Sequence, residues 1–145
     1  MNRDEKAFYI LEKAVYKAQK SLQKTKIIQP FLMLLTDSGE VEIYENKVKN
    51  LEESYGQLEE VAVKRVKLKD VDILVLVCEA LTPKQISQHA SHSIRIHLEE
   101  KSQIDKKIGA RFLYVPYELS LMDEEVSSVH LYQPIPVGFP AVFIV

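Results

Sequence analysis

The chain has 145 residues, of which 46% are hydrophobic and 28% are charged, and its formal net charge is −2. A chain of this length and composition can bury a hydrophobic core and differs clearly from disordered proteins. Its 19 basic and 21 acidic residues are interspersed. Because no part of the chain carries a strong positive field, we expect no nucleic-acid partner.

Cysteine use and apolar runs bear on the location of the protein. Cys78 is the only cysteine, so the chain has no internal disulfide of the kind that secreted scaffolds use. The first residues are charged, and the longest apolar run, 73–78, is far shorter than the roughly 20 residues of a membrane span. We therefore expect a cytoplasmic protein with no membrane partner.

The first half of the chain predicts a helix, a hairpin and a second helix. Apolar residues recur every three or four positions over 4–24 and again over 47–66, which is typical of amphipathic helices. Between them, the apolar run 31–36 and the alternating run 40–44 flank a short turn. Gly39 can adopt the positive φ that such a turn requires, so we predict a β-hairpin here.

The second half of the chain predicts strands. The run 71–80 is apolar on both faces, as in a central strand. Thr82 and Pro83 match the start of a short helix. The alternating run 93–99 and the run 110–116 predict a second hairpin, and a further strand is predicted over 129–132.

These elements predict a single α+β domain over residues 1–145. We expect a two-layer fold with a mainly antiparallel sheet of about five strands and two main helices on one face. Arg95, His97 and Glu99 alternate along one strand and are expected to mark the polar side of the sheet. Residues 134–145 form an apolar, proline-rich C-terminal segment, which we expect to be buried against this chain's own sheet or against a second subunit.

The order of elements and a few turn residues resemble a set of small bacterial proteins of unknown function. The residues that carry the resemblance are Pro30-Phe31, Asp37, Gly39, Glu99 and Pro116-Tyr117. The resemblance spans most of the chain and implies an α+β fold with an antiparallel sheet. It implies no activity and no catalytic residue.

A metal site is the first chemical alternative. His89, His92 and His97 lie within nine residues, but the spacing of the first two differs from the four-residue spacing of a zinc-binding helix. We therefore predict no tightly bound metal and no cofactor, and keep these histidines as a weak alternative.

Other catalytic alternatives are also weak. Cys78 lies within an apolar strand, which favours a buried thiol over a nucleophile. Glu79 and Glu99 could form a carboxylate pair if their strands were adjacent, although each is placed where a strand would emerge into solvent. The four glycines are too far apart to form a phosphate-binding loop.

The function predicted from the sequence is a non-catalytic ligand-binding or protein-interaction module. The alternatives are an enzyme whose site is assembled from scattered residues and a structural homo-oligomer, such as a homodimer. Aromatic residues near prolines favour contact with a partner. The predicted ligand or partner surface consists of Arg95, His97, Glu99, Tyr114, Tyr117, Phe139 and Phe143.

Overall fold

A computed structural model describes residues 2–85 and 90–145 of the protein. The elements follow in the order α1 (Arg3–Thr25), β1 (Phe31–Thr36), β2 (Val41–Glu45), α2 (Leu51–Val66), β3 (Val71–Leu81), β4 (His92–Glu100), a 3₁₀ turn (Lys101–Gln103), β5 (Ala110–Met122), β6 (Glu125–Leu131) and β7 (Ile135–Phe139).

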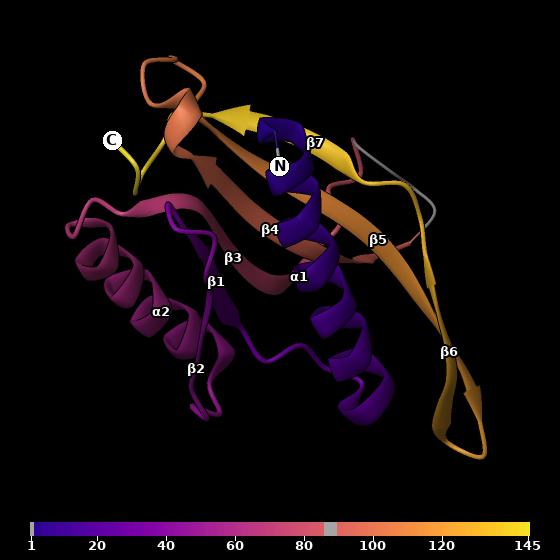
Figure 1. The fold of residues 1–145 in the computed structure, drawn as a ribbon. Coiled ribbons are helices and arrows are strands. Elements are labelled where there is room, and N and C mark those ends of the chain that lie inside the picture. The colour runs from indigo at the N-terminus through magenta and orange to yellow at the C-terminus, as the bar shows by residue number, and fades with distance from the viewer. Residues whose placement is uncertain (1, 86–89) are drawn as a thin grey trace.

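The seven strands form one antiparallel sheet with the order β2-β1-β3-β4-β5-β6, and β7 also pairs with β5 (Figure 1). The α+β fold with an antiparallel sheet is thus confirmed. The expected number of about five strands is too low, because the predicted strand near 129–132 is present as β6 and the proline-rich segment adds β7. β6 also begins earlier than predicted, at Glu125.

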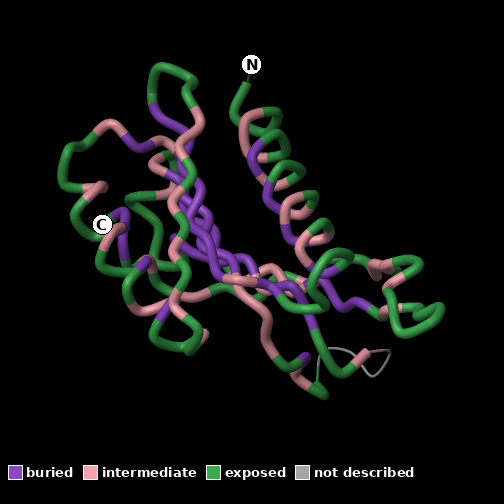
Figure 2. The backbone as a smooth tube through the Cα atoms, turned by 90° about the horizontal axis from the view of Figure 1, so that it is seen from below, coloured by how far each residue is buried: buried purple, intermediate pink, exposed green. Residues whose placement is uncertain are grey.

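The two helices lie on opposite faces of the sheet, so the prediction that both cover one face is wrong. Phe31 and Val75 belong to the core under α1, whereas Leu32 and Leu74 belong to the core under α2. Successive residues of a strand point to opposite faces, so strands that are apolar throughout need cover on both sides. Figure 2 shows the buried central strands and the single buried side of α1.

Local sequence explains where the helices begin and how the first hairpin turns. The side chains of Asn2 and Asn50 accept the backbone N–H groups of Glu5 and Glu53, at 2.9 and 3.0 Å. Gly39 has a φ of +89°, which confirms the predicted turn between β1 and β2.

The connection between β3 and β4 differs from the prediction. Residues 84–85 form a turn, and residues 86–89, which include His89, lie outside the described part of the chain. Thr82 caps no helix within the described residues. Instead its hydroxyl lies 2.6 Å from the hydroxyl of Ser93, and its N–H donates to the carbonyl of Ser91. Thr82 therefore closes the β3–β4 hairpin.

The C-terminal segment packs on this chain's own sheet. Ile135 pairs with Tyr114 and Phe139 with Ala110, and Pro136 is accommodated because β7 lies at an edge. Beyond β7, Phe143 and Ile144 are buried in the core under α2.

Candidate functional site

The α2-facing side of β4 carries three of the predicted surface residues. Arg95, His97 and Glu99 alternate along the strand, so their side chains share one face. On β5, Tyr114 lies opposite Arg95, and Phe112 lies opposite His97. Antiparallel register thus assembles a row of polar groups beside aromatic rings.

Glu99 is buried and fastens the C-terminal segment. Its carboxylate accepts the backbone N–H groups of Val142, Phe143 and Ile144 at 2.9, 3.0 and 2.8 Å, and it lies 2.6 Å from Nε2 of His97. Burial acts to raise the pKa of Glu99, but the bonds from His97 and the backbone outweigh it and hold that pKa below its ordinary value. Glu99 is therefore a structural anion whose carboxylate is hydrogen-bonded within the chain.

His97 is buried among aromatic rings. Its ring centroid lies 5.1 Å from those of Phe139 and Phe143 and 5.5 Å from that of Phe112. The expectation that His97 and Glu99 mark a solvated polar side is wrong, because the C-terminal segment covers them. An alternating strand looks the same in sequence whether its polar face meets water or a later segment of the chain.

Tyr117 does not join this group. It is buried in the core under α1, on the opposite face of the sheet. Its ring centroid lies 6.3 Å from that of His92, and burial raises the pKa of Tyr117 to about 12. Tyr117 closes the core and is not part of a surface shared with Arg95.

Arg95 differs from its neighbours because it has no ionic partner among the described residues. Its guanidinium carbon lies 4.4 Å from the ring centroid of Phe112 and 5.4 Å from that of Tyr55. Its Nε is buried and has no hydrogen-bond partner among the residues that the structure describes. No salt bridge joins Arg95 to a carboxylate in the part of the chain that the structure describes.

The groups nearest to Arg95 do not neutralise it. Cys78 lies directly opposite Arg95 on β3. Burial raises the pKa of the Cys78 thiol, and burial raises the pKa of Tyr55 to about 12. Both groups are therefore uncharged at neutral pH, while a guanidinium remains charged.

A cavity of about 280 Å³ lies beside Arg95. Its wall combines α2, the β1 entry and the sheet, and its described lining residues are Ile28, Pro30, Leu51, Glu52, Tyr55, Cys78, Glu79 and Arg95. Arg95 is the one basic side chain among them. Of the two acidic residues, Glu79 bonds to His92 at 2.5 Å, and Glu52 is exposed.

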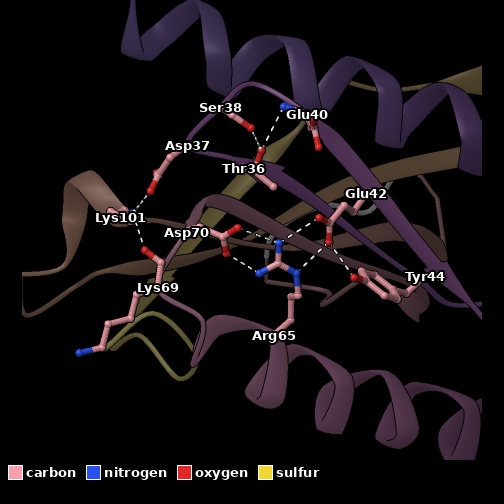
Figure 3. Close-up of polar contacts among 10 residues, drawn as sticks. All are labelled: Thr36, Asp37, Ser38, Glu40, Glu42, Tyr44, Arg65, Lys69, Asp70 and Lys101. Carbon is pink, nitrogen blue, oxygen red and sulfur yellow. Dashed lines mark hydrogen bonds and ion pairs between the residues drawn. The ribbon is translucent and has the colours of Figure 1, made fainter.

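Arg65 provides an internal contrast. Figure 3 shows it between Glu42 and Asp70, with Nε and Nη2 donating to the Glu42 carboxylate at 2.8 and 2.9 Å. These bonds hold the pKa of Glu42 and of Asp70 below their ordinary values. Tyr44 also donates to Glu42, at 2.7 Å. This arginine is fully engaged in holding the end of α2 to β2.

Of the weak metal alternative, His89 lies outside the described residues, and the two other histidines lie apart. His92 and His97 are five positions apart and lie on opposite faces of β4. Among the residues described, no three His, Cys, Asp or Glu side chains are grouped around a common point. Glu79 and Glu99 also fail to pair, because Glu79 is aligned with Ile94 and Glu99 with Leu74.

Tyr55 and Phe112 are site residues that the sequence did not identify, and Cys78 was expected to be a buried thiol and not part of a site. Tyr55 looked like one more apolar position of a helix. The available signal was the aromatic character of Tyr55 and Phe112, but it acquires meaning only through the fold, whose register aligns Arg95 with Cys78 and Tyr114.

Comparison with protein-family models, curated proteins and solved structures finds no match for this chain. No described helix is both long and apolar enough to cross a bilayer.

Proposed function

We propose that the protein is a binding module for a small organic carboxylate, which Arg95 holds in the cavity beside α2. The observation that carries the proposal is the partly buried guanidinium with an unsatisfied Nε and no carboxylate partner among the described residues. Buried donors are nearly always satisfied in folded proteins, and a guanidinium matches a carboxylate with two parallel bonds. A ligand carboxylate would complete this arrangement.

The charge of the cavity favours a monoanion. Arg95 supplies one positive charge, and the described lining has no second cation that a phosphate dianion would require. Glu52 and Glu79 add negative charge near the cavity and would disfavour additional anionic groups. A ligand with one carboxylate fits this balance best.

The size and wall of the cavity favour a compact, partly apolar ligand. Its volume of about 280 Å³ is at the lower end of ordinary ligand sites. Ile28, Pro30 and Leu51 offer apolar contact, and Tyr55 and Phe112 keep the guanidinium plane in place. An aromatic or branched acid of benzoate size meets these conditions.

The proposal is tested by NMR titration of the arginine Nε–H signals with benzoate. The Arg95 signal is assigned by its loss in Arg95→Lys. We expect it to shift saturably with benzoate, and we expect Arg95→Gln to weaken benzoate binding roughly tenfold or more, because one charge-assisted bond contributes about 1.5–3 kcal/mol.

The control variant is Arg111→Gln, whose arginine already donates to Glu100 at 3.0 Å. It should bind benzoate as the wild type does. Phenylphosphate separates a dianion from a monoanion, and benzylamine tests for simple apolar binding. A non-saturating shift of the Arg95 signal with benzoate, or an equal shift with benzylamine, would overturn the proposal.

A further inference from the structure

A second groove lies along the C-terminal half of α1, away from the Arg95 cavity. It has a volume of about 530 Å³ and runs between α1, the segment entering β1 and the end of β2. Its exposed aromatic surface comes from Tyr16, which is 58% exposed, with the buried ring of Phe31 at its floor, and its basic surface comes from Lys17, Lys20 and Lys24. The groove therefore combines aromatic contact with positive charge.

The lysines of this groove are only partly neutralised. Lys17 bonds to Glu45 at 3.0 Å and lies over the Phe31 ring. Lys20 lies over the ring of Tyr16, and neither Lys20 nor Lys24 forms a salt bridge with a described residue. Glu45 is the one acidic residue in the described lining. An anionic occupant would be favoured.

The β5–β6 hairpin has the opposite character. Figure 1 shows it extending past the rest of the sheet, and the strands remain paired up to Met122 and Glu125. Leu121 and Met122 are 56% and 68% exposed, next to the exposed acidic residues 123–125. The hairpin tip thus combines apolar side chains with a concentrated negative charge.

The turn at this tip has charged residues in backbone conformations that are unfavourable for them. Asp123 and Glu124 have φ values of +54° and +67°, the left-handed conformations of a tight hairpin turn. Asn-Gly or Asp-Gly is the favoured pair in such turns, and a glutamate at positive φ is strained. Glycine in place of Glu124 would make a more stable turn but would remove one of the tip charges.

From this complementarity we infer that the protein forms a twofold dimer in which the hairpin tip of each copy docks into the lysine groove of the other. Leu121 and Met122 would contact the exposed ring of Tyr16, and the acidic residues 123–125 would face the three lysines. In a single chain the tip is exposed, so it does not occupy its own groove. A twofold axis makes the two contacts identical and closes the assembly.

Two charge-reversal variants test this dimer by sedimentation equilibrium. The groove variant is Lys20→Glu with Lys24→Glu, and the tip variant is Asp123→Lys with Glu124→Lys. We expect the wild type to sediment with twice the monomer mass and each variant with the monomer mass. An equimolar mixture of the two variants should regain the dimer mass, because both contacts in the mixed dimer pair opposite charges.

The matched control is Lys106→Glu with Lys107→Glu, an exposed pair outside the groove with the same change of charge. It should remain dimeric, and the wild-type dimer should weaken as salt is raised. Thermal melting verifies that each variant is folded. A wild type that is monomeric at all concentrations, a dimer unaffected by either reversal, or a mixture that stays monomeric would overturn the inference.

Discussion

Arg65 and Arg95 lie on the same side of the sheet but in opposite electrostatic settings. Arg65 donates to two carboxylates and ties α2 to β2 and to the start of β3. Arg95 lies between two aromatic rings, beside a cavity, and no described residue accepts a hydrogen bond from its Nε. The first arrangement stabilises the folded chain by itself, whereas the second leaves binding capacity for a group from outside.

Glu99 extends the comparison along β4 itself. Glu99 lies four residues after Arg95 on the same face of β4. Its carboxylate is hydrogen-bonded to His97 and to three backbone N–H groups. Within one strand, then, the chain pairs the anion Glu99, whereas the cation Arg95 has no carboxylate partner among the described residues. A buried charge lowers the stability of the folded state unless it is paired. We therefore expect removal of the Glu99 charge to destabilise the fold and removal of the Arg95 charge to leave its stability unchanged.

The largest expected effect comes from Glu99→Gln. The amide would place an N–H donor against backbone donors, and we expect the free energy of unfolding to fall by about 2–4 kcal/mol. Denaturant unfolding measures this loss. Hydrogen exchange should show faster exchange of the amides of Val142, Phe143 and Ile144, which Glu99 accepts in the wild type.

The matched control for this variant is Glu100→Gln, because Glu100 bonds only to the half-exposed Arg111 in the described contacts. Glu100→Gln should lower the free energy of unfolding clearly less than Glu99→Gln does. The pKa of Glu99 is lowered from 4.5 in the folded state, so its contribution is complete above pH 4.5 and is lost as the pH falls through the lowered value. Equal acid sensitivity of wild type and Glu99→Gln would contradict this account.

Arg65→Met should have an intermediate effect. The substitution keeps an apolar side chain but removes the donors to Glu42 and Asp70. We expect the free energy of unfolding to fall by about 1–2 kcal/mol, since the pair is partly open to solvent. Lys64→Met, an exposed neighbour on α2, is the control and should change little. An Arg65→Met variant as stable as this control would contradict the claim that the bonds of Arg65 stabilise the folded chain.

Much of the fold could be predicted because its signals are local. The β1–β2 hairpin depends on Gly39, and β3 is apolar at nearly every position. β1 and β3 are apolar on both faces, and this also indicates helices on both sides of the sheet. Leu32 and Leu74 on one face must be buried just as Phe31 and Val75 are on the other. The prolines of the C-terminal segment left an edge strand and an extended arm as alternatives, and pairing with β5 shows that residues 135–139 form an edge strand.

The site was predictable only in part because it depends on long-range register. Arg95 was identified from the alternation of β4, but its lack of an ionic partner among the described residues becomes visible only when the fold places Cys78, Tyr55 and Phe112 around it. His97 and Glu99 were expected in solvent because nothing within β4 reveals that residues 142–144 return to cover them.

The most direct test of the central claim is the free energy of unfolding of Arg95→Met, measured with and without benzoate. Methionine preserves the apolar stem, and the lost cation–π contact of about 0.5–1 kcal/mol is offset by the removal of a desolvated charge. We predict a variant as stable as the wild type without benzoate, and one that, unlike the wild type, gains no stability from benzoate. A loss as large as that of Arg65→Met, with benzoate stabilisation retained, would show that Arg95 is a structural residue and contradict the account.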